Sequence, residues 1–276
     1  TKNNSRSSTE GVWVLIHEER KKAMNTQTVQ EQLRTLRLNT AAEELEEVIA
    51  KNKKAVHLAW VSELLEREVD ARKEKALTSR IKRAAFPEIT TLEGFNWKFN
   101  PEIEEARIRE LTNLDFVRNH RISLFLGAPG TGKTHLAIAI GVLATRAGLP
   151  VYCTSLKALA RKITLAKLKN ELDSLFNRML SAKLWIIDDW GVVTLTREVA
   201  EEIFDLLDRR KYNSAMILTS NRDIDEWGQV LPDPVLANAT IDRIFDRADV
   251  VLFKGESYRL KGRINIPEVD KHELRQ

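Results

Sequence analysis

The chain has 276 residues, enough for two domains or for one α/β domain with an appendage. Its 44 basic and 40 acidic residues leave a net charge of only +4, so the charge balance alone does not indicate a nucleic-acid partner. A single cysteine, Cys153, excludes a disulfide framework and a cysteine-based zinc site, which suits a reducing cytoplasm.

No apolar run approaches the roughly 20 residues that a membrane helix needs, so no membrane partner is expected. The apolar stretch 11–16 is short, is followed by charges and lacks a small-residue cleavage site, so it does not have the pattern of a signal peptide. Residues 1–23 precede the first clear helical pattern, and we expect them to form a disordered upstream segment.

Residues 24–90 are predicted to form a small all-helical domain of three helices. The third helix runs from about residue 55 to 85 and ends before Phe86-Pro87. Its first half carries an apolar stripe, and its second half replaces that stripe with basic residues. These are Arg72, Lys73, Lys75, Arg80, Lys82 and Arg83. They are either a phosphate-binding surface for DNA or a solvated helix end.

Residues 91–101 are irregular and rich in aromatic side chains, and they are predicted to be a linker between two domains. Phe95, Trp97 and Phe99 alternate in it. Either they lie in the second domain beside a bound nucleotide base, or they simply pack the linker in place.

From residue 102 to 264 the pattern alternates between helix and strand. Strands are predicted at 122–126, 151–154, 184–188, 215–219 and 249–253. Such alternation is typical of an α/β fold with a parallel five-stranded sheet and helices on both faces. The functional site is then expected at the carboxyl ends of the strands, and residues 265–276 form a tail.

The segment after the first strand matches the pattern G-x-x-x-x-G-K-[ST] and is followed by a helix. Successive backbone N–H groups and the helix N-terminus then point at a phosphate. Lys133 would reach the terminal phosphates of ATP, and the Thr134 hydroxyl would hold Mg²⁺. The predicted nucleotide-binding residues are Gly127, Ala128, Pro129, Gly130, Thr131, Gly132, Lys133, Thr134 and His135.

The third strand runs directly into two acids, Asp188 and Asp189. We assign Asp188 to Mg²⁺, and Asp189 to orienting or deprotonating the attacking water. The alternative for adjacent acids after a strand is a helix N-cap. The fourth strand ends next to the phosphate loop, so Asn221 can bond the γ-phosphate or the water. An asparagine in that place is otherwise a turn former.

Arg243 and Arg247 are four residues apart on the helix before the last strand. Arg243 is either an arginine finger that contacts the nucleotide of the next subunit or part of a surface salt-bridge network.

Taken together, these motifs resemble the IstB/DnaC-like AAA+ ATPases, and most closely the IstB group, from Met24 to about Lys261. The phosphate loop is shared by many families, whereas other strings are specific to this one. The matching strings are Asp188-Asp189-Trp190-Gly191, Leu218-Thr219-Ser220-Asn221, Glu226-Trp227-Gly228, Asp233-Pro234-Val235, Asp242-Arg243 and Lys254-Gly255-Glu256-Ser257-Tyr258-Arg259-Leu260.

The resemblance implies an ATPase with ATP and Mg²⁺ that assembles into rings or spirals on double-stranded DNA, bends it, and assists a transposase in bacterial cytoplasm. It implies that Asn221 is a sensor, Arg243 a finger acting in trans, and Arg259 a second sensor. It also implies that the basic segment 155–181 faces DNA, and the alternative for that segment is a solvated amphipathic hairpin. That segment includes Lys162, Lys167 and Lys169.

Two features depart from the family pattern. Asp189 stands where many relatives have Glu. Only about twenty residues follow the last strand, too few for a full three-helix C-terminal lid. Three other functions stay open: a replicative helicase loader, a monomeric P-loop kinase for a small molecule, and a nucleotide switch that does not hydrolyse ATP.

Overall fold

The computed structural model describes residues 26–51 and 59–261. The segments predicted at 1–23 and 265–276 lie outside the described residues. The chain divides into two compact units between Thr78 and Ser79, earlier than the predicted end of the helical domain at residue 90. Each unit is described by itself. Among the described residues, no helix is long and apolar enough to cross a membrane.

The first unit consists of helices in its described part. Residues 26–35 are helical, α2 spans Asn39–Lys51, and α3 spans Ala59–Ala84, so α3 contains the division between the units. Val29, Leu33 and Ala42 form a small buried cluster between these helices. Val61, which belongs to the predicted apolar stripe of the third helix, packs against that cluster. The stripe therefore packs onto a small core that residues 26–35 and α2 supply.

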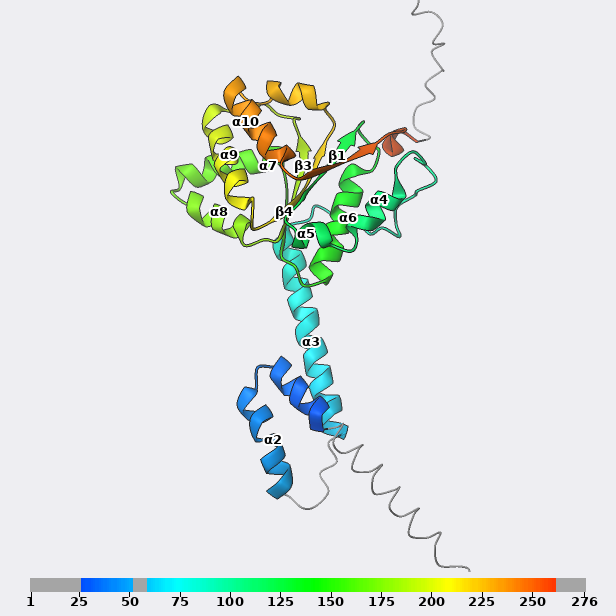
Figure 1. The fold of residues 1–276 in the computed structure, drawn as a ribbon, viewed down its shortest axis with the longest axis vertical. Coiled ribbons are helices and arrows are strands. Elements are labelled where there is room, and N and C mark those ends of the chain that lie inside the picture. Colours follow the sequence, from blue (N-terminus) through cyan, green and yellow to red (C-terminus); the bar gives the residue numbers. More distant parts are fainter. Residues whose placement is uncertain (1–25, 52–58, 262–276) are drawn as a thin grey trace, which may run out of the picture. The chain divides into compact units, whose positions relative to one another are not determined.

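The second unit contains a five-stranded parallel sheet (Figure 1). Its strands, in chain order, are β1 (Ile122–Gly127), β2 (Val151–Ser155), β3 (Leu184–Trp190), β4 (Ala215–Ser220) and β5 (Ala248–Phe253). They are arranged in the order β2-β3-β4-β1-β5. This confirms the predicted sheet. The strands are nearly continuous apolar runs because both faces of a parallel sheet are covered.

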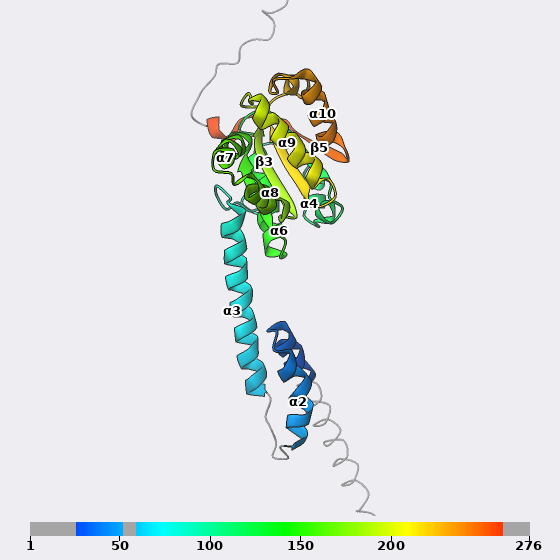
Figure 2. The same cartoon turned by 90° about the vertical axis from the view of Figure 1, so that its left-hand side faces the viewer.

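Helices cover both faces of the sheet (Figures 1 and 2). One apolar layer joins it to α4 (Glu105–Leu111), α5 (Asp115–Arg118) and α6 (Lys133–Arg146). The opposite layer joins it to α7 (Leu156–Leu168), α8 (Leu172–Leu180), α9 (Arg197–Arg210), the short helix η1 (Ile224–Gln229) and α10 (Pro234–Phe245). The long segment 155–181 is thus two helices, α7 and α8.

Strand β3 contains a β-bulge at its carboxyl end. Ile187 pairs with Leu218 of β4, yet Trp190 pairs with Ser220, so two residues of β3 oppose one residue of β4. The packing shows the same interruption, because Ile187 and Trp190 lie in the same apolar layer although they are three positions apart. The two bulged residues are Asp188 and Asp189. A bulge at this point re-aims side chains at the edge where a ligand binds.

After β5 the described chain forms only the short helix η2 (Tyr258–Leu260) before it ends at residue 261. This segment lies against the phosphate loop, because the backbone N–H of Tyr258 donates to the carbonyl of Gly130 at 2.9 Å.

Candidate nucleotide site

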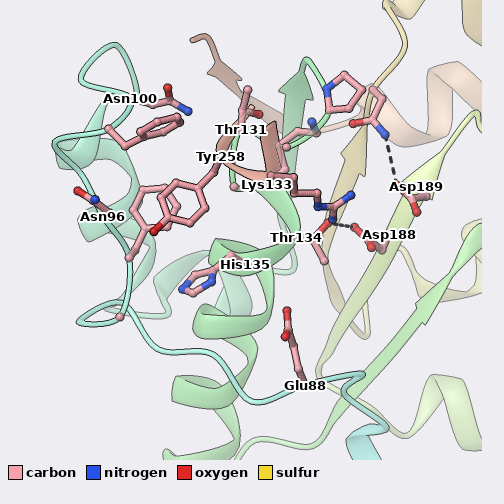
Figure 3. A pocket seen from close by; sticks show the side chains of 18 residues that line it. Glu88, Asn96, Asn100, Thr131, Lys133, Thr134, His135, Asp188, Asp189 and Tyr258 are labelled. Atoms are coloured by element: carbon pink, nitrogen blue, oxygen red, sulfur yellow. Dashed lines mark hydrogen bonds between the residues drawn. The ribbon is translucent and has the colours of Figure 1, made fainter. Parts of the chain in front are cut away.

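A cavity of about 360 Å³ lies at the carboxyl ends of β1, β3 and β4, within the range of small-molecule sites (Figure 3). The phosphate loop forms its floor, and Asp188 and Asp189 lie on one side. Asn100 and Tyr258 lie on the other side, with Lys133 between the two groups. The cavity is where parallel α/β sheets bind their ligands.

Two glycines of the phosphate loop are required by conformation and by close contacts. Gly130 has φ of +80°, and an added Cβ would lie 2.1 Å from the hydroxyl oxygen of Ser257. Gly132 has φ of +103°, and a Cβ there would lie 2.4 Å from the ring of Phe95. The loop is therefore enclosed by the linker on one side and by the C-terminal segment on the other.

Lys133 is buried at the start of α6 with 5% of its surface exposed. Its Nζ donates to the carbonyl oxygens of Gly127 and Ala128, each at 2.7 Å. Burial lowers the pKa of Lys133 to about 8, although Asp188 and Asp189 favour its charged form. The ammonium is thus held inside the loop, where phosphate oxygens would be its counter-charge.

Thr134 and Asp188, the two residues predicted to hold Mg²⁺, lie within hydrogen-bond distance of each other. The Thr134 hydroxyl donates to Oδ1 of Asp188 at 2.8 Å (Figure 3). The Thr219 hydroxyl donates to the same oxygen at 2.5 Å. A hydroxyl and a carboxylate are hard oxygen ligands, and Mg²⁺ at nucleotide sites takes one or two such protein ligands besides phosphates and water. The pair therefore fits a Mg²⁺ ion.

Asp189 and Asn221 are also brought together. Asn221 Nδ2 donates to Oδ1 of Asp189 at 3.4 Å, and both residues line the cavity. Burial and the neighbouring Asp188 raise the pKa of Asp189, whereas Arg259 and Lys133 oppose that shift. A carboxylate with a raised pKa is a better proton acceptor from water. The structure shows no helix N-cap role for Asp188 or Asp189, since both lie within β3.

The linker aromatics both line the cavity and pack against neighbouring rings, and their contact with a nucleotide base stays a prediction. Phe95 and Phe99 line the cavity, while Trp97 packs edge-on against Phe95 with ring centroids 4.7 Å apart. Phe99 packs in the same way against Tyr258, at 5.0 Å. Residues 91–101 lie within the second unit and form one wall of the cavity.

Asn100 connects residues 91–101 to the C-terminal segment through two hydrogen bonds. Its Nδ2 donates to the carbonyl of Glu256 at 3.0 Å, and its Oδ1 accepts from the N–H of the same residue at 3.1 Å. Sequence reasoning missed this contact, because the two residues are far apart in the chain. It also missed Glu88, Asn96 and Tyr258 as lining residues. The position of Tyr258 beside the predicted Arg259 was the one available signal.

Arg259 lines the cavity from η2, although no lid carries it in the described chain. Its charge acts on both Lys133 and Asp189, which places it near the terminal-phosphate end of the site.

Arg243 does not line the cavity of its own chain. Its Nε lies 2.8 Å from Oδ1 of Asp208 on α9, and its guanidinium lies 5.6 Å from the ring centroid of Phe204. The sequence did not predict this ion pair because Asp208 belongs to another helix. An arginine finger that acts in trans must lie away from the cavity of its own chain, and Arg243 meets that requirement. The role of Arg243 as a finger stays a prediction.

The basic residues predicted on α3 differ in their surroundings. Arg72 pairs with Glu68 at 2.7 Å, and Lys73 pairs with Asp70 at 3.2 Å. Lys75 and Lys82 are exposed, and neither forms an ion pair within residues 26–51 and 59–261. Arg80 is half-buried and Arg83 exposed. DNA contact by this surface stays a prediction, and Lys75 and Lys82 are its most available cations.

On α7, Lys162 donates to the hydroxyl of Tyr152 at 3.0 Å and to that of Thr154 at 3.3 Å. Lys167 pairs with Glu202 of α9 at 2.7 Å. Lys169 is exposed at the end of the helix. The predicted DNA-facing role of these three residues is likewise untested by the fold.

The fold and the site define an ATP-binding P-loop protein with an AAA+ fold. DnaA from Aquifex aeolicus, solved with AMPPCP, is similar with a TM-score of 0.52 and 21% identity, over 64% of this chain and 54% of that one. DnaI is similar with a TM-score of 0.50 and 20% identity, over 61% and 89%.

The chain belongs to the IstB-like ATP binding protein family, whose model matches residues 28–265. The ATP-binding protein assigned to insertion sequence IS21 of Pseudomonas aeruginosa is 40% identical over 71% of this chain and 74% of its own length. The one assigned to IS232 of Bacillus thuringiensis subsp. berliner is 33% identical over 83% and 92%.

Proposed function

We propose that this protein is a Mg²⁺-dependent ATPase that assembles on double-stranded DNA and assists the transposase of an insertion sequence. The observation that carries the ATPase proposal is the arrangement in one cavity of a phosphate loop, the Thr134–Asp188 pair and the Asp189–Asn221 pair. The names of the relatives support the connection to insertion sequences.

In the proposed reaction, the backbone N–H groups of the loop bind the β- and γ-phosphates, and Lys133 replaces its carbonyl contacts with phosphate oxygens. Bound Mg²⁺, held by Thr134 and Asp188, would neutralise charge on the phosphates. Asp189 accepts the proton of the attacking water, and Asn221 holds that carboxylate in place.

Arg259 supplies one cation at this site, and within residues 26–51 and 59–261 no other arginine of the same chain lines it. We propose that Arg243 of a neighbouring protomer supplies it, so that ATP joins the subunits. Release of Arg243 from Asp208 accompanies that contact. The oligomer would then present the exposed basic residues of many subunits to one duplex, which multiplies weak phosphate contacts.

The test is a measurement of particle mass with ATP, with ADP or with neither, each with and without a DNA duplex. The proposal predicts growth that requires both ATP and the duplex, and none for Lys133→Ala. A protein that stays monomeric and phosphorylates a small molecule would instead be a kinase. A protein that ignores DNA and binds a replicative helicase would be a helicase loader. ATP-dependent assembly without any phosphate release would identify a nucleotide switch.

A further inference from the structure

Two strings of the sequence, Thr219-Ser220-Asn221 and Glu226-Trp227-Gly228, contain side chains that the proposed reaction does not use. We propose that Thr219, Ser220 and Trp227 are positioning residues, whose hydrogen bonds hold the bulge of β3 that presents Asp188 and Asp189 to the same nucleotide. This inference rests on the proposed ATPase function. None of the three residues lines the cavity, so they act through the two acids.

The bulge is needed because consecutive residues of a regular strand point to opposite faces of the sheet. Without it, Asp188 and Asp189 would point apart, yet both line the cavity. The bulge also places Asp189 at φ of +56°, in the left-handed region that residues with a side chain rarely adopt. Two neighbouring carboxylates in a strained backbone need contacts that hold them there.

Thr219 lies opposite the bulge and bonds to both of its residues. Its hydroxyl accepts from the backbone N–H of Asp189 at 3.1 Å and donates to Oδ1 of Asp188 at 2.5 Å. One side chain therefore fixes the carboxylate proposed to hold Mg²⁺ and the backbone of the residue proposed to activate water.

Ser220 joins the strand ends that follow the two site residues. It is fully buried, and Trp190 O at 2.8 Å is the nearest acceptor for its hydroxyl. The hydroxyl oxygen of Ser220 also accepts from the N–H of Arg222 at 3.1 Å and from the indole N–H of Trp227 at 3.2 Å. One donated and two accepted hydrogen bonds are the full capacity of a hydroxyl group. Since Trp190 follows Asp189 and Arg222 follows Asn221, Ser220 sets the spacing of the Asp189–Asn221 pair.

Trp227 holds this arrangement from outside the sheet. It is fully buried on η1, and its ring packs against Trp190 at 5.9 Å between centroids. On its other side it packs against Phe245 of α10 at 6.0 Å. Its indole nitrogen would lose its only described partner if the Ser220 hydroxyl were removed.

The test compares Thr219→Val, which keeps the shape of the side chain and removes both hydrogen bonds, with Thr219→Ser, which keeps the hydroxyl. Thr219→Val should leave the Kd for ATP within about twofold and lower kcat by about 10- to 100-fold, as expected for misplaced catalytic groups. Thr219→Ser should recover most of the rate. Trp227→Phe, which removes the indole N–H together with the five-membered ring that carries it, should lower kcat in the same direction and serves if Thr219→Val does not fold.

Ser214→Ala is the matched control. Ser214 is fully buried just before β4, and its hydroxyl donates to Ala182 O at 2.6 Å, at the opposite end of that strand from the site. The same kind of bond is lost far from the acids, so kcat should not change.

The outcomes separate the two proposals. Absence of ATP hydrolysis by the unaltered protein, with Mg²⁺ and a DNA duplex present, would refute the ATPase proposal itself. Normal hydrolysis by Thr219→Val and Trp227→Phe would refute the positioning role alone. An equal loss of kcat in Ser214→Ala would show a general structural effect and would also refute it.

Discussion

The buried ammonium of Lys133 makes a quantitative prediction about pH. Its pKa in the nucleotide-free protein is lowered to about 8 by burial, from an ordinary value of 10.5. A bound phosphate favours the charged form and raises that pKa again. Binding above pH 8 must therefore take up a proton, and the Kd for ATP should rise about tenfold for each pH unit from 8 towards 10. Below pH 7 the lysine is charged in both states, and its contribution to the pH dependence disappears.

The assay is calorimetric titration with ATP at pH 7, 8, 9 and 9.5, in two buffers of different ionisation enthalpy, which measures the Kd and the protons taken up together. Lys133→Arg is the control, because arginine stays charged throughout this range. Its affinity is expected to be weaker and independent of pH. If the Kd of the unaltered protein stayed constant between pH 7 and 9.5 without proton uptake, the assignment of a buried, perturbed Lys133 would be wrong.

The same shift sets the stability of the nucleotide-free protein. Between pH 8 and 9 the unfolded chain keeps the proton of Lys133 while the folded chain has lost it, so this group makes the free energy of unfolding rise with pH in that window. Above pH 9 the raised pKa of the buried Cys153 thiol opposes the rise. In urea unfolding at pH 8 and 9, the change in the free energy of unfolding should be more positive for the unaltered protein than for Lys133→Met. A fall of equal size for both proteins would contradict the expected direction of the change.

Three further changes test other parts of the site and surface. Arg243→Ala should retain ATP binding and lose hydrolysis and assembly, whereas the nearby Arg247→Ala should keep all three; normal hydrolysis by Arg243→Ala would exclude the finger. The double variant Lys75→Glu with Lys82→Glu should weaken DNA binding and lower the slope of log affinity against log salt by roughly one per cation removed. An unchanged slope would mean that the basic residues of α3 are solvated and do not contact DNA. Asn100→Ala removes two hydrogen bonds worth about 0.5–1.5 kcal/mol each and should weaken ATP binding by up to about 100-fold, measured by fluorescence titration. An unchanged Kd would mean that the C-terminal segment is held without Asn100.

The sequence predicted the parts of this fold that depend on local pattern. The five strands begin and end within about two residues of their predicted bounds, because buried parallel strands are continuous apolar runs. The phosphate loop was equally predictable, since its glycines and Lys133 have fixed spacing.

The sequence could not predict the contacts between segments that lie far apart in the chain. Alternation along a strand would send Asp188 and Asp189 to opposite faces, and only the register against β4 reveals the bulge. The pairing of Arg243 with Asp208 depends on how α9 and α10 pack. The bonds between Asn100 and Glu256 need the whole fold to bring the linker to the C-terminal segment.

The central claim, that the nucleotide is shared between neighbouring protomers, is tested most directly by mixing two inactive variants. Asp189→Asn lacks the proposed base but keeps Arg243, and Arg243→Ala lacks the proposed finger but keeps Asp189. In an equal mixture of randomly assembled subunits with head-to-tail interfaces, about one quarter of the sites would combine an intact Asp189 with a neighbour's intact Arg243. The account predicts that ATP hydrolysis with DNA recovers to about a quarter of the unaltered rate, and a mixture as inactive as each variant alone would contradict it.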